Sequence, residues 1–307
     1  MSGGSQPGLS RARYSTGVMT QTIPSDANGQ RDAVRRYYDV NTRLFRLFGG
    51  DRGTQTVHRS VWADGVRSLD AALSYTNGLV LDQALGLAAA IPVIGDLGCG
   101  TGGTLLYLAP RLARPFTAVG LTLSPVQAAQ ARRNLAPFAH CATLVGDFQK
   151  LPLPDAGLDL AFSIEAFIHA PDPDRYLSEV VRVLRPGGRL FLCDDFLNAA
   201  HTPGPVEADW LDEYRTGWLA NALLPAEEVV ARARRHGLRL LERRDLTPQL
   251  KLRALPGPVA RGVLGLRRAL GWQDAIATST TGSVALQQCL ASGAILYQTL
   301  LFERALD

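Results

Sequence analysis

The sequence predicts an α/β protein in which a parallel sheet is covered by helices on both faces. Three observations support this fold class: a high apolar content, an alternation of strand-like and helix-like segments, and a glycine-rich loop between a strand and a helix. With 307 residues and 46% apolar content, the chain can bury a full α/β core and an added layer of helices. We therefore expect one core with attachments.

The N-terminal part of the chain is expected to be helical after a tail. Residues 1–30 contain no apolar run of signal-peptide length and read as a disordered tail. Apolar residues then recur at helical spacing in segments 34–48 and 66–85. These patterns predict a helical cap over residues 31–90.

Strands and helices alternate in the part of the chain that follows. The helical patterns "SPVQAAQARRNL" and "DPDRYLSEVVRVL" lie between strand-like segments, which favours a parallel sheet. Two late segments, "GLRLLERRDL" and "AILYQTLLFER", suit an edge pair that closes the sheet. The preceding strands are expected in "IPVIGDLG", "FTAVGL", "ATLVGD", "LDLAFSI" and "GRLFLCDDF".

Charge and cysteine content exclude several classes of function. The net charge of +4 comes from scattered basic residues, so no nucleic acid or other polyanionic polymer is expected as a partner. The four cysteines are far apart and form no CxxC pair, which argues against a zinc site or a disulfide framework. No run approaches membrane-spanning length. We expect a cytoplasmic protein with a small-molecule ligand, no resident metal and no membrane span.

The strongest chemical signal is the loop "DLGCGTGG", which starts at Asp96 and follows a strand directly. Glycines at 98, 100 and 103 allow a tight turn and a close approach of the backbone to a ligand at a helix N-terminus. The spacing alone also fits a nicotinamide-dependent oxidoreductase. Such a site needs an acidic residue about 20 positions later, and the sequence there, "AVGLTLSP", has none.

The ordered motifs of residues 90–200 resemble those of the class I S-adenosylmethionine-dependent methyltransferases. They are "DLGCGTGG", "GLTLSPVQ" and "GDFQKLPLPDAGLDLAFSIEAFIHAPDPDRYLSEVVRVLRPGGRLFLCDDF". The motif "GLTLSPVQ" resembles the corresponding motif of one branch of this class, which contains the sterol, tocopherol and prenyl diphosphate methyltransferases. The resemblance implies a Rossmann-like core over residues 91–307, with a seven-stranded, mostly parallel sheet in the order 3-2-1-4-5-7-6. It also implies a helical lid at about 200–225, between the fifth and sixth strands, and an insertion at about 250–282.

The resemblance implies that S-adenosyl-L-methionine is the cofactor. Two of the implied contacts also have simpler interpretations, because Asp147 could cap a helix and Phe148 could belong to the core. The implied cofactor residues are Asp96, Gly98 and Gly100 at the methionine end, Thr122 and Gln127 near the ribose, and Asp147 and Phe148 around the adenine.

A carboxylate, Glu165, lies inside the apolar run "SIEAFIHA". An ionised carboxylate in an apolar setting is costly unless it has partners or a task. Open parallel sheets bind ligands outside the carboxyl ends of their strands, so Glu165 is expected to face the substrate as a catalytic base. The alternative is a structural carboxylate that pairs with an arginine or caps the next helix. Nearby, His169 either orients Glu165 in catalysis or is an ordinary loop residue.

Aromatic residues follow the core at helical spacing. Trp210, Tyr214 and Trp218 share one face of the helical segment "VEADWLDEYRTGWLAN". They form either a core stripe or a lid whose rings, Trp210 in particular, stabilise a carbocation.

The segments "RRYYDVNTRLFRLFGG" and "VHRSVWADGVRSLD" resemble the N-terminal cap of bacterial prenyl diphosphate C-methyltransferases. Arginine forms paired, charge-assisted bonds with phosphate oxygens. The alternative is a solvated helix face with a core tyrosine. The candidate substrate-binding donors are Tyr38, Asn41, Arg46 and His58.

The sequence therefore predicts C-methylation of an isoprenoid alkene, most simply a prenyl diphosphate with an isopentenyl, geranyl or farnesyl chain. Glu165 would remove a proton from the resulting carbocation. No "DDxxD" motif is present, so any Mg²⁺ would be carried on the substrate diphosphate. One alternative is a methyltransferase for a prenylated or aromatic natural product without diphosphate, and another is a catalytically silent cofactor-binding partner protein. A homo-oligomer is also expected.

Overall fold

A seven-stranded sheet forms the centre of the computed structural model, which describes residues 26–48 and 58–306. For residues 27 and 41–48 only the backbone is described. The strand order is β3-β2-β1-β4-β5-β7-β6, which confirms the predicted topology. The strands are β1 Val93–Leu97, β2 Thr117–Thr122, β3 Cys141–Val145, β4 Leu158–Ile164, β5 Leu184–Leu197, β6 Leu238–Asp245 and β7 Ile295–Arg304.

Five neighbouring strands, from β3 to β5, run parallel, and β7 pairs antiparallel with both β5 and β6. The predicted edge pair is therefore confirmed. The central strands read as nearly continuous apolar runs because both of their faces are covered. Ile94, Leu160 and Phe162, for example, are fully buried.

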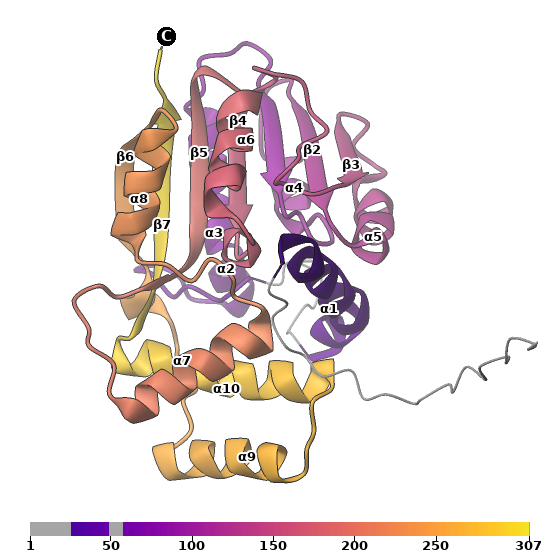
Figure 1. Cartoon of the computed structure of the whole chain (residues 1–307). Coiled ribbons are helices and arrows are strands. Elements are labelled where there is room, and N and C mark those ends of the chain that lie inside the picture. The colour runs from indigo at the N-terminus through magenta and orange to yellow at the C-terminus, as the bar shows by residue number, and fades with distance from the viewer. Residues whose placement is uncertain (1–25, 49–57, 307) are drawn as a thin grey trace, which may run out of the picture.

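Helices cover both faces of the sheet, with α6 and α8 in front of it and α3 behind it in the view of Figure 1. None of the helices within the described ranges is long and apolar enough to cross a membrane. The α-helices are α1 Ala27–Phe48, α2 Leu69–Leu73, α3 Tyr75–Leu85, α4 Gly103–Leu108, α5 Pro125–Leu135, α6 Pro173–Val183, α7 Pro205–Trp218, α8 Ala226–Arg235, α9 Gly257–Ala269 and α10 Ala275–Ser292; two short 3₁₀ helices are Phe167–His169 and Thr247–Gln249.

Helix α1 lies beside α5 near the carboxyl ends of the parallel strands (Figure 1). It begins at Ala27, inside the range expected for the tail, and residues 1–25 lie outside the described part of the chain. Ser124, the N-cap of α5, donates its hydroxyl to Asp39 of α1 at 2.5 Å. Buried Val34 and Tyr37 pack against Leu219. These contacts fix the cap over the sheet end where ligands are expected.

Helices α7, α9 and α10 gather below the sheet in Figure 1. Helices α7 and α8 follow the fifth strand, whereas α9 and α10 lie between β6 and β7. Helices α7 and α10 cross at two glycines, because a Cβ on Gly217 would lie 2.8 Å from Cα of Gly282 and 2.4 Å from the carbonyl oxygen of Thr278. A buried ion pair of 2.8 Å between Glu213 and Arg267 ties α9 to α7. We call these three helices the lid.

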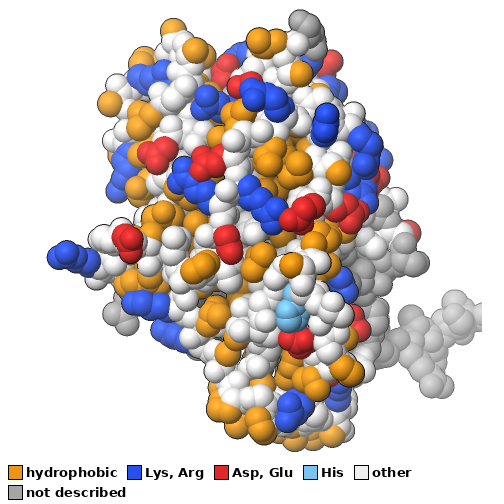
Figure 2. All heavy atoms as spheres, turned by 90° about the vertical axis from the view of Figure 1, so that its left-hand side faces the viewer, with side chains coloured by type: hydrophobic (Ala, Val, Ile, Leu, Met, Phe, Trp, Pro, Cys, Tyr) orange, Lys and Arg blue, Asp and Glu red, His pale blue; other side chains and the backbone are white. Residues whose placement is uncertain are grey.

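Figure 2 shows one face of the molecule, on which arginines and acidic side chains are interspersed rather than gathered by sign. Exposed ion pairs such as Arg239 with Glu303 and Arg243 with Glu227 lie on and beside β6. This face therefore presents no continuous basic stripe of the kind that nucleic acid requires.

The glycine crossing predicts opposite effects for two alanine substitutions. Gly217→Ala should lower the free energy of unfolding by about 1–3 kcal/mol, because the new methyl group would meet backbone atoms that cannot move aside. Gly265→Ala on α9 is the matched control, since nothing lies within 4 Å of its Cβ position. It should stabilise the protein by up to about 1 kcal/mol through helix propensity. Urea unfolding measures both effects, and a neutral Gly217→Ala would contradict the close crossing.

Candidate active site

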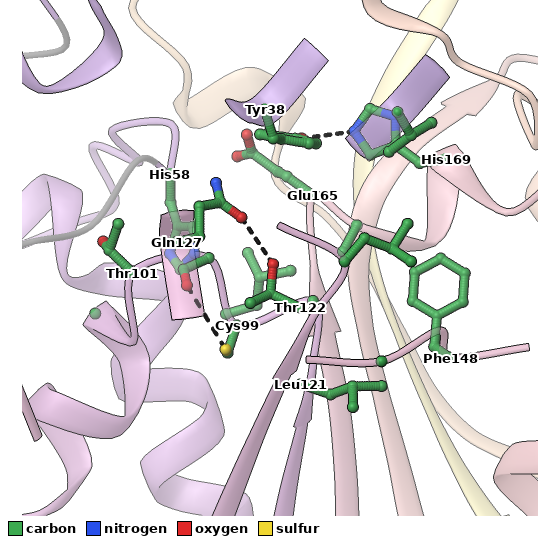
Figure 3. A pocket seen from close by; sticks show the side chains of 18 of the residues that line it. Tyr38, His58, Cys99, Thr101, Leu121, Thr122, Gln127, Phe148, Glu165 and His169 are labelled. Atoms are coloured by element: carbon green, nitrogen blue, oxygen red, sulfur yellow. Dashed lines mark hydrogen bonds between the residues drawn. The ribbon is translucent and has the colours of Figure 1, made fainter. Parts of the chain in front are cut away.

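A cavity lies where the glycine-rich loop, the end of β4 and helix α1 meet (Figure 3). It contains about 1130 Å³ of space between atoms, including a part that is open to solvent. A concave site with a largely apolar lining and a few polar side chains is typical of small-molecule binding. The predicted site residues that line it are Tyr38, His58, Gly98, Gly100, Thr122, Gln127, Phe148, Glu165, His169 and Trp218.

The remaining predicted residues lie elsewhere. Asp96 and Asp147 lie close in sequence to residues that line the cavity but do not line it themselves. Trp210 and Tyr214 are only 4% and 1% exposed and belong to the hydrophobic core. The side chains of Asn41 and Arg46 lie outside the described residues.

The glycine-rich loop presents its backbone to the cavity. Gly98, Gly100 and Gly102 have φ angles of +106°, +53° and +83°, a region that favours glycine. A Cβ on Gly98 would lie 2.4 Å from that of Ala166, so this glycine is required by packing. At Gly100 the nearest neighbour of a Cβ would be Nε2 of Gln127 at 3.9 Å. A side chain at position 100 would therefore occupy the space that is available to a ligand.

Two side chains, one at the end of β2 and one in the first turn of α5, are arranged to meet a polar ligand group. The Thr122 hydroxyl donates to Oε1 of Gln127 at 2.8 Å, as Figure 3 shows. The amide N–H₂ of Gln127 faces the loop at Gly100 and can donate to ligand hydroxyl groups. This geometry fits the predicted ribose contact.

The neighbouring residues Asp147 and Phe148 differ in their access to the cavity. Phe148 lines it and makes a T-shaped contact with Tyr176, with ring centroids 5.1 Å apart. Asp147 instead accepts the backbone N–H of Gln149 at 2.8 Å. Burial raises the pKa of Asp96, which lies behind the loop at the end of β1, and a cationic amino group nearby would oppose that shift. The residues present therefore fit S-adenosylmethionine.

Glu165 follows β4 with a φ of +50°, a left-handed conformation that is uncommon for a residue with a side chain. Its Oε1 atom accepts the backbone N–H of Arg59 and the hydroxyl of Tyr297, each at 2.9 Å. Within the described part of the chain, Oε2 accepts no hydrogen bond. The alternative in which Glu165 caps the next helix is wrong, because Asp172 caps α6. Among the described residues, the carboxylate is thus oriented through one oxygen only.

Within the described part of the chain, Glu165 forms no ion pair with an arginine, because the guanidinium of its neighbour Arg59 is paired with Asp195. The Arg59 guanidinium binds both carboxylate oxygens of Asp195 at 2.6 and 2.7 Å, and the Tyr214 hydroxyl donates to the same carboxylate. Burial raises the pKa of Asp195, and Arg59 and Tyr214 oppose that rise. Sequence reasoning missed this pair and Tyr297, although the two adjacent aspartates in "LCDDF" were a signal of the same kind as Glu165.

His169 is buried beside the cavity and bonded through both ring nitrogens. Its Nδ1 lies 3.2 Å from the carbonyl oxygen of Leu219, which can only accept, so Nδ1 carries the proton. Nε2 therefore accepts the hydroxyl hydrogen of Tyr38 at 2.7 Å (Figure 3). Burial lowers the pKa of His169 to about 4, so the ring is neutral at pH 7. The Tyr38 hydroxyl is engaged with this histidine.

Of the three aromatic residues predicted on the lid, Trp218 reaches the cavity. Its indole N–H lies 3.3 Å from the carbonyl oxygen of Ser279 and 3.3 Å from the hydroxyl of Ser283, both on α10. The helical stripe is therefore divided between core packing, at Trp210 and Tyr214, and the cavity wall at Trp218.

Comparison with known proteins agrees with this geometry. Residues 95–192 match the family model described as "Methyltransferase domain". The chain therefore carries a methyltransferase domain, and its sheet order is that of the class I S-adenosylmethionine-dependent methyltransferase fold. Tocopherol O-methyltransferase of Arabidopsis thaliana is 25% identical over 290 residues, which cover 89% of this chain and 79% of that protein.

Two further relatives bear on the enzyme's fold and length. The 27-O-demethylrifamycin SV methyltransferase of Amycolatopsis mediterranei is 28% identical over 221 residues, which cover 72% of this methyltransferase and 76% of that one. The crystal structure of geranyl diphosphate C-methyltransferase from Streptomyces coelicolor A3(2) superposes with a TM-score of 0.69 at 19% identity. The superposition covers 92% of this chain and 100% of that chain, and that complex contains Mg²⁺, geranyl diphosphate and S-adenosyl-L-homocysteine.

The loop geometry predicts that Gly100→Leu abolishes binding of S-adenosylmethionine by the methyltransferase without unfolding it. Gly271→Leu is the matched control, because Gly271 has a similar φ of +63° and nothing within 4 Å of its Cβ position. Both variants should lose about 1–2 kcal/mol of stability from left-handed strain. Calorimetry should detect no cofactor binding by the first variant and normal binding by the second. Equal affinity in the two variants would contradict the site assignment.

The buried histidine predicts a loss of stability in acid. The folded-state pKa of His169, about 4, lies below its ordinary value of 6.5, so protonation favours the unfolded chain. This contribution is complete above about pH 6.5 and falls by roughly 2–3 kcal/mol as the pH drops to about 4.5. Denaturant unfolding of the methyltransferase and of His169→Gln at several pH values measures it. The variant should lack this part of the slope, and parallel curves would contradict the assignment.

Proposed function

We propose that this methyltransferase transfers a methyl group to an alkene carbon of an isoprenoid, with Glu165 as the base and a prenyl diphosphate as the leading substrate. The observation that carries this proposal is the Glu165 carboxylate, with Oε1 held by two donors and Oε2 left for a substrate proton, in the cavity that the glycine loop also lines. S-adenosylmethionine, when bound, supplies a methyl group on a cationic sulfur.

Methylation of an alkene requires a base at a defined step. The two π electrons of the alkene form the new C–C bond, the electron pair of the broken S–CH₃ bond stays on sulfur, and the other alkene carbon becomes a cation. Oε2 of Glu165 then takes a proton from a carbon next to the cation, and the C–H electron pair forms a new alkene. His169 is a poor candidate for this step, because its Nε2 atom already accepts the Tyr38 hydroxyl.

The cation also needs stabilisation until the proton leaves. Trp218 lines the same cavity as Glu165, and an aromatic face next to a desolvated cation contributes on the order of 2 kcal/mol. We therefore assign this role to Trp218 in place of Trp210, which is buried in the core.

Recognition of a diphosphate would depend on the N-terminal cap. His58 lines the cavity, but burial lowers its pKa, so it can donate one hydrogen bond without carrying a charge. The charged group would then be Arg46, and Asn41 is the other candidate donor on α1. No group of three or more His, Cys, Asp or Glu side chains among the described residues could hold a metal. Any Mg²⁺ would arrive on the diphosphate itself. The homo-oligomer and the cytoplasmic location stay predictions.

One observation favours a second candidate, methylation of an uncharged natural product. The cavity lining that the structure describes contains neither lysine nor arginine, and an anion without a cationic partner is costly to bury. In this reaction Glu165 would accept the proton of a substrate hydroxyl group. Two of the relatives are named for tocopherol and rifamycin substrates.

A substrate panel separates the two candidates. The enzyme is incubated with methyl-labelled S-adenosylmethionine and isopentenyl, geranyl or farnesyl diphosphate, or with the corresponding alcohols, followed by mass spectrometry. We expect a C-methylated diphosphate. Equal turnover of the alcohols would remove diphosphate recognition, and label on oxygen would replace C-methylation by O-methylation. Arg46→Ala should raise KM for a diphosphate and leave cofactor affinity unchanged.

Replacing the base tests its role directly. Glu165→Gln keeps the shape and hydrogen-bonding capacity but removes the basicity, so turnover should fall by about 10² to 10⁴ while cofactor binding persists. Water could trap a longer-lived cation, so an altered product is also expected. The melting temperature is the control for a structural role. Normal turnover with the normal product would remove Glu165 from the mechanism.

A further inference from the structure

Both donors that orient Glu165 are connected to one guanidinium group. The backbone N–H of Arg59 donates to Oε1, and the Arg59 guanidinium lies 4.7 Å above the ring of Tyr297, whose hydroxyl is the second donor. The same guanidinium is held by Asp195 through two short bonds. We propose that Arg59 is a positioning residue for the base, and that its ion pair with Asp195 fixes the direction of Oε2. This inference rests on the proposed role of Glu165.

The register of the sheet explains why these groups meet. In the antiparallel pairing of β5 with β7, Asp195 lies directly opposite Tyr297. Glu165 follows β4, the other neighbour of β5, and its backbone N–H donates to Cys193 at 2.8 Å. Three adjacent strands thus supply the anchor, the second donor and the base. Arg59 is the member of the network that comes from outside the sheet.

Burial makes the ion pair a fixed contact. The side chains of Asp195 and Arg59 are only 1% and 16% exposed, and two parallel bonds allow one orientation of the guanidinium. The segment of Arg59 is also held further along, because the N–H of Trp62 donates to the carbonyl oxygen of Gln249 at 2.7 Å. The backbone N–H that faces Glu165 is therefore fixed on both sides. The Arg59 guanidinium binds Asp195, and Arg59 is not among the residues that line the cavity.

The test removes the ion pair without leaving a single buried charge, because an unpaired partner would destabilise the fold for an unrelated reason. The double variant Arg59→Gln/Asp195→Asn is compared with Tyr297→Phe, which removes the second donor alone. The matched control is Glu213→Gln/Arg267→Gln, which removes another buried ion pair, with exposures of 5% and 14%, in the lid. Melting temperatures show how much each change affects folding.

With the panel substrate that turns over, the Arg59/Asp195 variant should lower kcat by about 10- to 100-fold, the range expected for a misplaced group. Its cofactor affinity and KM should change little, and the control pair should retain wild-type kcat. The Arg59/Asp195 change and Tyr297→Phe are each also made in the Glu165→Gln variant. Neither should lower kcat below that of Glu165→Gln alone, because a positioning residue acts only through the base. Additive losses, or a wild-type kcat in the Arg59/Asp195 variant, would overturn the inference.

A measurement without substrate completes the test. In the enzyme loaded with S-adenosylhomocysteine, the Arg59 amide proton, followed by NMR, should exchange slowly and should lose protection in the Arg59/Asp195 variant but not in the control. Unchanged protection would overturn the positioning role by itself. Wild-type turnover by Glu165→Gln would instead refute the proposed function. The two failures are therefore distinguishable.

Discussion

The central constraint on this molecule is a carboxylate that must stay available at the end of a buried strand. A carboxylate between apolar neighbours needs hydrogen-bond donors, while a direct bond from a cationic side chain would occupy the oxygen that the proposed chemistry needs. The structure meets both requirements with neutral donors, a backbone N–H and a tyrosine hydroxyl, on one oxygen. The positively charged guanidinium of Arg59 binds Asp195 and does not contact Glu165 directly. The left-handed backbone at Glu165 belongs to the same arrangement, because it turns the side chain at the strand end.

This constraint divides the cavity into two parts with different structural origins. The cofactor side is built by strand ends and the loops directly after them, where parallel register fixes Gly100, Thr122 and Phe148 relative to one another. The substrate side is built by attachments: helix α1, the segment of His58 and Arg59, and the lid with Trp218. Each attachment is held by specific long-range contacts, such as Ser124 with Asp39 and the Gly217–Gly282 crossing.

Five of the seven residues predicted to contact the cofactor line the cavity, and their signals in the sequence are local. Strand periodicity and glycine spacing are read within a few residues, and neighbouring strands then bring those residues together. The substrate side depends on partners more than 100 positions apart, such as Arg59 with Asp195 and Tyr38 with His169. Helical spacing placed three lid aromatics on one face, but it could not show that packing against α10 would leave Trp218 on the cavity. Tyr297 gave no signal, because an aromatic residue in an apolar strand is typical of a core.

The same division explains how one methyltransferase core can accept substrates of different charge. In the proposed mechanism, the acidic proton of the substrate must reach Oε2 of Glu165, and the base makes no demand on the distant end of the substrate. That end meets the cap, where His58 is held neutral by burial. A cationic side chain supplied by α1 would select a diphosphate, whereas its absence would select a neutral molecule of similar length. In the proposed mechanism, a few side chains of the cap would therefore select the charge of the substrate, while the chemistry at Glu165 would remain the same.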